Sequence, residues 1–230
     1  VVSALYFANR LYQLPLALFG VSISMVSLPF MSDARAEKKT GAVAKNLFDS
    51  FAASLFLIIP STLGLIILAG ETVSLLFERG LFSSGSTAMT SAALVFYSAG
   101  LAAFAGIRIF ANYFYSKKDM RTPVKIAVLS FIVNIAGDIA ALVFHLGPGG
   151  LAGATSLAAV VNFTLLAVLV VKDGIRPPPS FFRKLYSVFI SSVCLAGFLL
   201  APLHMHTLLK IALGSGIYFV CARLFKREDI

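Results

Sequence analysis

Long apolar runs separated by short polar connections are the main feature of this sequence. Each run is close to the roughly 20 residues that an α-helix needs to cross about 30 Å of hydrocarbon. The runs cover approximately residues 5–29, 48–69, 88–111, 124–146, 150–171, 185–203 and 207–225. They do not alternate with period two as barrel strands do, and lipid offers an open backbone no hydrogen-bond partner. The pattern therefore predicts an all-α fold, a polytopic membrane helix bundle with about seven transmembrane helices.

The composition excludes a soluble domain. Apolar residues make up 59% of the chain and charged residues 13%, whereas roughly a quarter of the residues are charged in ordinary soluble domains. The formal net charge of +9 raises the question of nucleic-acid binding. However, the basic residues lie in short clusters between apolar runs rather than on one face with interleaved aromatics. We therefore predict membrane lipids as partners, and no nucleic acid.

The segments between the runs differ sharply in charge. Fifteen basic residues lie in alternate segments: Arg35, Lys38, Lys39, Lys45, Lys117, Lys118, Arg121, Lys125, Lys172, Arg176, Arg183, Lys184, Arg223, Lys226 and Arg227. The opposite segments, around residues 70–87, 147–149 and 204–210, contain only Arg79 and Lys210. Cytoplasmic connections of membrane proteins carry an excess of Lys and Arg. We therefore predict a cytoplasmic C-terminus, an external residue 1 and an odd number of spans.

Proline and glycine divide the chain. Residues 147–150 (Gly-Pro-Gly-Gly) are predicted to form a tight external turn, and residues 176–180 (Arg-Pro-Pro-Pro-Ser) a stiff cytoplasmic linker. We expect residues 1–172 to form a bundle of about five spans, residues 173–184 a linker, and residues 185–230 an appended helical pair with a basic tail. The chain begins at Val1 without a recognisable signal peptide, so we interpret it as part of a longer protein.

The sequence lacks the motifs of metal, redox or hydrolytic sites. Cys194 and Cys221 lie in apolar runs without CxxC spacing, so neither a disulfide framework nor a metal site is indicated. His145, His204 and His206 fall at external span ends, where interfacial histidines are ordinary. There is no nucleotide-binding loop, zinc-protease motif or Ser/His/Asp set. We therefore expect no cofactor, no metal and no ATP-driven or hydrolytic mechanism.

Ionisable side chains within the apolar runs are the first candidates for function. An Arg or Asp near mid-bilayer costs about 2.5 to 3.5 kcal/mol on insertion scales and usually faces a cavity or a partner. Arg10 lies at the outer end of the first run beside Tyr6 and Tyr12, where it either snorkels to lipid headgroups or faces a cavity. Arg108, near the inner end of its run, allows the same two interpretations.

Asp138 lies deeper, as the thirteenth residue of the uncharged stretch 126–146, and Asn134 precedes it by one helical turn on the same face. Two interpretations stay open for this pair. It is either a structural hydrogen-bonding pair between helices or a cavity-facing site for an ion or a polar substrate. Residues 13–15 (Gln-Leu-Pro) predict a bent or broken helix, a device that transporters use around binding sites.

Three local motifs occur in a characteristic order. Residues 4–15 read Ala-Leu-Tyr-Phe-Ala-Asn-Arg-Leu-Tyr-Gln-Leu-Pro, followed by Leu-Phe-Gly-Val at 18–21 and Leu-Pro at 28–29. Residues 114–126 read Phe-Tyr-Ser-Lys-Lys-Asp-Met-Arg-Thr-Pro-Val-Lys-Ile, and residues 150–156 read Gly-Leu-Ala-Gly-Ala-Thr-Ser, leading to Asn162. Over nearly the whole chain this order resembles the C-terminal half of the lipid II flippases of the MurJ (MviN) family.

The resemblance implies a fold of the multidrug/oligosaccharidyl-lipid/polysaccharide exporter superfamily, with two six-helix lobes around a central cationic cavity. This chain would supply roughly spans eight to fourteen, and the missing N-terminal lobe would be a partner. The implied function is that of a transporter and not an enzyme. It moves lipid II, the undecaprenyl-pyrophosphate-linked peptidoglycan precursor, across the bacterial inner membrane by alternating access. The last two helices, about residues 185–225, would take the polyprenyl tail.

The resemblance assigns substrate contact to Arg10, with Asn9 and Gln13 beside it. Many relatives carry Asp before this Arg and Glu three residues after it, so the amides here leave a more positive site. Asn134, Asp138 and Arg108 are possible polar residues of the same cavity. Two alternatives remain: an exporter of another polyprenyl-linked oligosaccharide, or an inactive half-length membrane scaffold. A polyprenyl-phosphate-processing enzyme is disfavoured, because no His or Asp cluster gathers at one interface.

Overall fold

The computed structural model describes residues 1–201 and 206–227, with side chains described to residue 223. Its elements are α1 (Val2–Pro15), the π-helical η1 (Leu16–Val21), α2 (Ser22–Ala36), α3 (Thr40–Ile67), α4 (Ala69–Phe77), α5 (Ser84–Ala99), α6 (Leu101–Ser116), α7 (Arg121–Val143), α8 (Gly147–Lys172), α9 (Pro179–Leu200) and α10 (Thr207–Arg227). The described residues contain no strand. The predicted all-α class is therefore confirmed.

Six helices in the described part are long and apolar enough to cross a membrane. They are Val2–Ala36, Thr40–Ile67, Ser84–Ser116, Arg121–Val143, Gly147–Lys172 and Pro179–Leu200. The first six predicted spans are thus confirmed. The seventh predicted run, 207–225, forms helix α10, but it reaches beyond the residues whose side chains are described. Its role as a span stays a prediction.

The first span changes its winding where the sequence predicts an irregular helix. Pro15 lacks the N–H that would continue the α-helical ladder, and the π-helical segment η1 follows it directly. The chain nevertheless stays helical from Val2 to Ala36. The irregularity lies at the predicted position, but the helix continues as a π-helical segment instead of breaking. Short π-helical segments of this kind occur frequently at functional sites.

The turn between α7 and α8, predicted to be external, differs from the prediction in its position along the chain. Residues 147–150 form the first turn of α8, with Pro148 at a helix-starting position where its missing N–H costs nothing. The chain reverses just before, with positive φ angles at His145 (51°) and Gly147 (64°). Proline therefore marks the beginning of the helix here, and the turn itself lies on the preceding residues.

Small residues of α8 let α5 approach closely. A Cβ added at Gly149 or Gly153 would lie 3.2 or 3.3 Å from the ring of Phe96. The hydroxyl of Ser156 donates to the Phe96 carbonyl at 2.7 Å. A Cβ at Gly100, where α5 gives way to α6, would lie 2.6 Å from that hydroxyl. The glycine spacing of α8 thus serves packing within the chain.

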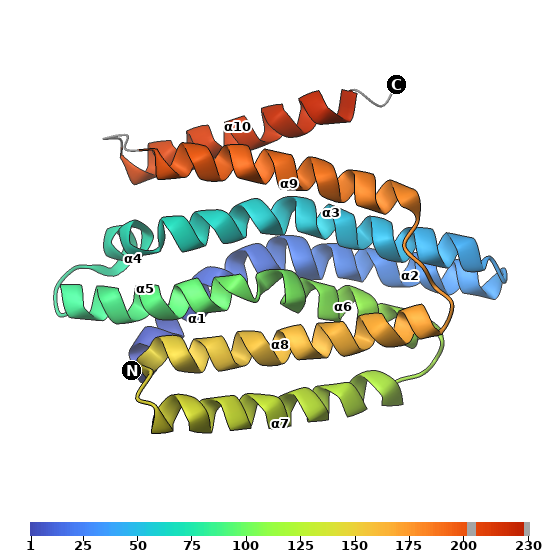
Figure 1. The fold of residues 1–230 in the computed structure, drawn as a ribbon, viewed down its shortest axis with the longest axis horizontal. Helices are drawn as coiled ribbons and strands as arrows, with labels where there is room; N and C mark the ends of the chain where they lie inside the picture. The colour runs from blue at the N-terminus through green and yellow to red at the C-terminus, as the bar shows by residue number, and fades with distance from the viewer. Residues whose placement is uncertain (202–205, 228–230) are drawn as a thin grey trace.

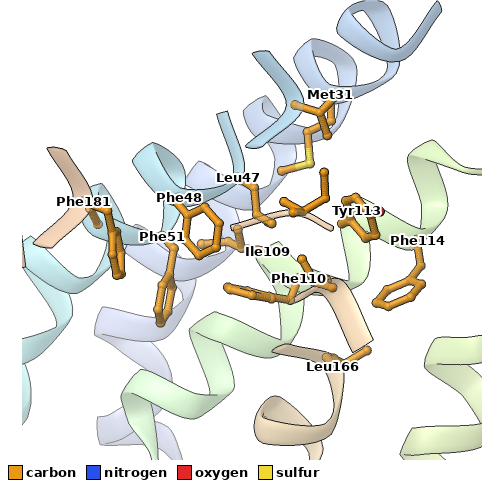
Figure 2. Close-up of a cluster of buried hydrophobic side chains, with 14 of the residues drawn as sticks. Met31, Leu47, Phe48, Phe51, Ile109, Phe110, Tyr113, Phe114, Leu166 and Phe181 are labelled. Atoms are coloured by element: carbon orange, nitrogen blue, oxygen red, sulfur yellow. The ribbon is translucent and has the colours of Figure 1, made fainter. Parts of the chain in front are cut away.

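Aromatic side chains fill the inner core cluster, the group of buried residues nearest the α2–α3 and α8–α9 connections (Figure 2). Phe51 of α3 meets Phe110 of α6 edge-on, with ring centroids 5.3 Å apart. Phe48, also on α3, lies 5.2 Å from Phe181 at the start of α9. Such contacts contribute about 0.5–1.5 kcal/mol each beyond the area they bury. They join the helix after the linker to the preceding bundle.

The basic connections gather at one end of the molecule. Figure 1 shows the α2–α3, α6–α7 and α8–α9 connections together at one end, and α4, the α7–α8 turn and the N-terminus at the other. Helix α9 lies along α3, and α10 lies along α9. The arrangement keeps the two charge classes about one helix length apart, as the predicted topology requires.

Cysteine labelling tests that topology. After replacement of Cys194 and Cys221 by serine, we expect cysteines at Ser84 and Gly147 to react with an impermeant maleimide added to intact spheroplasts. Cysteines at Thr40 and Arg176 should react only after lysis, because their connections carry the excess of Lys and Arg. All four positions lie on exposed connections or helix ends. The reverse labelling pattern would contradict the predicted orientation.

Candidate functional site

The polar residues predicted on the first span share one stretch of α1. Arg10 is exposed, its Nη2 donates to the hydroxyl of Tyr6 at 2.9 Å, and its guanidinium lies 5.1 Å from the centroid of that ring. Gln13 donates to the Asn9 side-chain oxygen, and Asn9 Nδ2 donates to the Tyr12 hydroxyl at 3.5 Å. Arg10 thus keeps a full positive charge that only neutral groups orient.

A stack of aromatic rings lies directly behind this surface. Tyr12 stacks on Tyr97 of α5, with centroids 4.8 Å apart, and on Phe104 of α6 at 5.6 Å. Both tyrosines are buried, with 7% of Tyr12 and 8% of Tyr97 exposed. The stack fixes α1 against the point where α5 meets α6. Sequence reasoning missed it, although tyrosines within apolar runs were an available signal.

Asn134 and Asp138 lie near two rings of this stack, Phe104 and Tyr97 respectively. Asn134 Nδ2 donates to Thr155 Oγ1 of α8 at 3.5 Å, and that hydroxyl donates to the Leu151 carbonyl at 3.2 Å. Asp138 is half-buried and lies within electrostatic range of Tyr97. Within the described part of the chain its carboxyl group forms no ion pair or hydrogen bond. The structure thus brings Asn9, Gln13, Asn134 and Asp138 near one aromatic stack.

A groove of about 210 Å³ opens between α6, α7 and α8. Four of its lining residues are polar: Ser130, Asn134, Thr155 and Asn162. The rest are apolar, with Phe104 of the aromatic stack at one edge. Polar side chains at this depth of a membrane bundle usually face a partner or a water-filled space rather than lipid.

Arg108 stands apart from Asp138. It lies one helical turn after Phe104, is exposed on α6, and forms no ion pair or hydrogen bond with any described residue. Arg108 lies within electrostatic range of the Tyr12 hydroxyl. The described residues thus contain no ion pair between Arg108 and Asp138, the two ionisable groups predicted on these spans.

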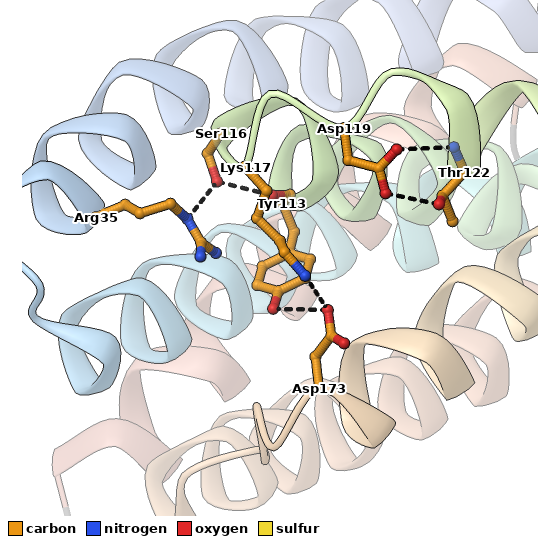
Figure 3. A network of polar contacts seen from close by, with 7 residues as sticks. All are labelled: Arg35, Tyr113, Ser116, Lys117, Asp119, Thr122 and Asp173. Atoms are coloured by element: carbon orange, nitrogen blue, oxygen red, sulfur yellow. Dashed lines mark hydrogen bonds and ion pairs between the residues drawn. The ribbon is translucent and has the colours of Figure 1, made fainter.

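The motif at residues 114–126 forms a polar network at the basic end (Figure 3). Lys117 Nζ lies 2.5 Å from Asp173 Oδ2, and the Tyr113 hydroxyl donates to the same oxygen at 3.1 Å. Arg35 Nε donates to Ser116 Oγ at 3.3 Å. These contacts tie α6 to α2 and to the end of α8, so this part of the motif has a structural role.

Asp119 caps the N-terminus of α7. Its carboxylate accepts the backbone N–H groups of Arg121 and Thr122, both at 3.1 Å, and the Thr122 hydroxyl at 2.6 Å. These hydrogen bonds, those from Thr122 first, lower the pKa of Asp119. An acid at a helix N-terminus also complements the helix dipole. The Asp-Met-Arg-Thr-Pro sequence therefore encodes a helix start rather than a substrate contact.

The Asp173 network gives a pH-dependent stability. The hydrogen bond from Lys117 is the main cause that lowers the pKa of Asp173 below its ordinary value of 3.8. A lowered carboxyl pKa stabilises the folded state above the ordinary pKa, and the stabilisation is lost as the pH falls through the lowered pKa. About a third of each side chain is exposed, so screening limits the effect to about 1 kcal/mol or less.

We expect Asp173→Asn to lower the thermal unfolding midpoint in detergent at pH 7, with the difference from the parent shrinking as the pH falls below 4. Asp33→Asn is the matched control, because Asp33 is an exposed carboxylate in the last turn of α2, at the same end, and its side chain forms no hydrogen bond with a described residue. A constant difference between pH 7 and pH 3 would contradict a role for the Asp173 charge.

Comparison with known proteins places the chain among membrane transporters. The family profile described as "Lipid II flippase MurJ" matches residues 1–222. The "Probable lipid II flippase MurJ" of Thermotoga maritima is 30% identical over 234 residues, covering 100% of this chain and 47% of the relative. That of Vibrio cholerae is 36% identical over 165 residues, covering 72% of this chain and 31% of the relative.

A solved structure gives the same result. It is titled "Lipid II flippase MurJ, inward closed conformation" and superposes with a TM-score of 0.84 at 29% identity. The match covers 99% of this chain and 47% of the other. The chain thus spans about half the length, or less, of the relatives it matches.

Proposed function

This chain belongs to the MurJ family of lipid II flippases, and we propose that it acts as the C-terminal half of a transporter that moves lipid II from the inner to the outer leaflet of the bacterial plasma membrane. The observation that carries the proposal is Arg10, an exposed arginine on the first span whose polar contacts are all neutral. Similarity to flippases over the whole length of the chain supports it.

Arg10 would bind the pyrophosphate of the substrate. A guanidinium presents a planar fork of donors that contacts phosphate oxygens in pairs, which a lysine ammonium cannot do. The contact with Tyr6 uses one Nη2 donor and holds the side chain in place. Asn9 and Gln13 bind each other and Tyr12, so they add no negative charge near the anion.

The face of α1 and α2 that carries Arg10 would meet the missing N-terminal lobe across the transport cavity. Large side chains on this span are strongly exposed, among them Tyr6, Leu14, Leu18, Met25 and Phe30. Within the described part of the chain no other helix covers them. Alternating access would then move this face against the second lobe, and the π-helical segment after Pro15 lies in the middle of it.

The helical pair α9–α10 would receive the polyprenyl tail. Phe182, Tyr186, Phe189 and Val193 form an exposed, mostly apolar row along α9. The pair is attached to the bundle through α3, because Lys184 pairs with Asp49 at 2.7 Å and the Tyr218 hydroxyl donates to the Phe56 carbonyl at 2.6 Å. We therefore propose residues 185–230 as a tail-binding unit that is docked on the lobe formed by residues 1–172.

Substitution of Arg10 tests the function. In the full-length protein that carries this sequence, Arg10→Ala should abolish lipid II translocation into the outer leaflet of proteoliposomes, because the lost group binds the pyrophosphate. Arg10→Lys should restore it only partly, since an ammonium cannot make the two-pronged contact. Membrane insertion should be unchanged, because Arg10 is exposed and its side chain hydrogen-bonds to Tyr6, which is also exposed. Gln13→Glu, which restores the acid common in relatives, should be tolerated.

The outcomes of this test separate the candidate functions. Full translocation by Arg10→Ala would assign Arg10 to lipid headgroups. If the unsubstituted protein moves another polyprenyl-linked oligosaccharide but not lipid II, the chain belongs to an exporter of different specificity. If it moves neither, the inert scaffold is the better description.

Substitution of Asp138 decides between its two roles. No positive side chain pairs with Asp138 among the described residues, which favours a neutral packing role beside Asn134 and Tyr97. We therefore expect Asp138→Asn to retain both expression and lipid II translocation. Normal expression with lost translocation, or with an altered dependence on cations, would instead show that the negative charge is required in one conformational state.

A further inference from the structure

Arg79 and Lys210 are the two basic residues in the connections that otherwise lack them, and both contact the short helix α4. Figure 1 shows α4 nearly end-on, so it runs across the direction of the spans at the end opposite the basic connections. Lys210 Nζ pairs with Glu71 Oε1 in the first turn of α4 at 3.1 Å. Arg79 Nη2 donates to the Leu76 carbonyl in its last turn at 2.8 Å. Each cation thus occupies one end of a single helix.

The Glu71 end of α4 holds α10. Besides Lys210, Glu71 accepts the Thr207 hydroxyl through Oε2 at 2.9 Å, so both carboxylate oxygens bind α10. These hydrogen bonds, that from Thr207 first, lower the pKa of Glu71. The Lys210 side chain is only 15% exposed. Removal of the carboxylate would therefore leave a shielded ammonium without its partner, which is costlier than the loss of an exposed pair.

The other end of α4 holds α1. Phe77 lies 4.7 Å from Phe7, and Phe82 in the following loop lies 5.5 Å from the same ring, measured between centroids. Phe7 is one helical turn before Arg10. Between the two ends, Val73 of α4 is fully buried in a second core cluster, together with Leu11 of α1 and Leu94 of α5. A core-packed helix therefore connects the external end of α10 with the turn of α1 that carries Arg10.

We propose that α4 is a strut that holds the external end of α10 in a fixed position relative to the Arg10-bearing turn of α1, with Glu71 as a positioning residue. The proposal rests on the proposed function in one respect: a lipid with a charged headgroup and a long tail would engage α1 and α10 together. If the α9–α10 pair were displaced, the headgroup of a lipid bound to both would no longer lie in the correct position at Arg10. Glu71 itself touches no substrate.

Distance measurements in lipid nanodiscs test the strut directly. The full-length protein would carry Cys194→Ser and Cys221→Ser, with spin labels at Ala212→Cys on α10 and Met89→Cys on α5, both exposed positions. We expect a narrow distance distribution in this background and a broad one after Glu71→Gln or Lys210→Glu. The exchange Glu71→Lys with Lys210→Glu should restore the narrow distribution. Glu78→Gln is the matched control, because Glu78 accepts from Thr87 of α5 and does not contact α10.

Lipid II translocation is measured on the same variants. In enzymes, a misplacement of about 1 Å lowers a rate by up to about a hundredfold. By analogy we expect Glu71→Gln to lower the translocation rate by up to about a hundredfold, with recovery in the charge exchange. A distribution that stays narrow in Glu71→Gln overturns the strut. A broad distribution with unchanged translocation overturns the positioning role. If the background protein fails to translocate lipid II, the proposed function fails, while the distance distributions still decide whether the strut exists.

Discussion

The inability of lipid to hydrogen-bond the chain is the constraint on which this structure depends. Every backbone group in the spans must find its partner within a helix, and a polar side chain is costly there unless it finds a partner nearby. Serine and threonine hydroxyls meet this need locally, as Ser192 does by donating to the Val188 carbonyl one turn earlier. Charged groups cannot be satisfied in this way, so they are confined to the ends. Arg10, Arg108 and Asp138 lie within the predicted apolar runs instead, which makes them the first candidates for function.

Aromatic contacts help to hold the helices of this bundle together, because the hydrophobic effect does not drive their association within lipid. Between helices already in lipid, association depends on packing and on specific side-chain contacts rather than on removal of surface from water. The inner cluster around Phe51 and Phe110 and the outer stack of Tyr12 on Tyr97 each join helices that are distant in sequence. The outer stack also lies close to candidate polar residues, because the Tyr12 hydroxyl accepts from Asn9 and Tyr97 lies within electrostatic range of Asp138.

The sequence was a good guide to the spans and a poor guide to what lies between them. Hydrophobic length and connection charge depend on local composition, so they predicted six spans that the described residues contain. Helix α4 was missed because its nine residues are too few to produce a periodic signal and its burial depends on α1 and α5. The Gly-Pro-Gly-Gly sequence was assigned to the wrong element because proline suits both a turn and a helix start. Arg10 and Asp138 were found from charge alone, but the aromatic stack of Tyr12 on Tyr97 depends on tertiary contacts that no local pattern encodes.

The neutral surroundings of Arg10 contrast with the paired cations at the basic end. Lys117 pairs with Asp173 and Lys184 pairs with Asp49, so each of these charges is offset by a partner and helps to hold two parts of the bundle together. Two unit charges 4 Å apart interact by about 4 kcal/mol at an effective dielectric constant of about 20. An acid beside Arg10 would therefore weaken, without abolishing, the attraction between the arginine and an anionic ligand. Tyr6 instead orients the guanidinium through its hydroxyl and ring without neutralising it. Amides at positions 9 and 13 leave that charge without an acidic neighbour on the same helix, which strengthens the contact that we propose between Arg10 and a pyrophosphate.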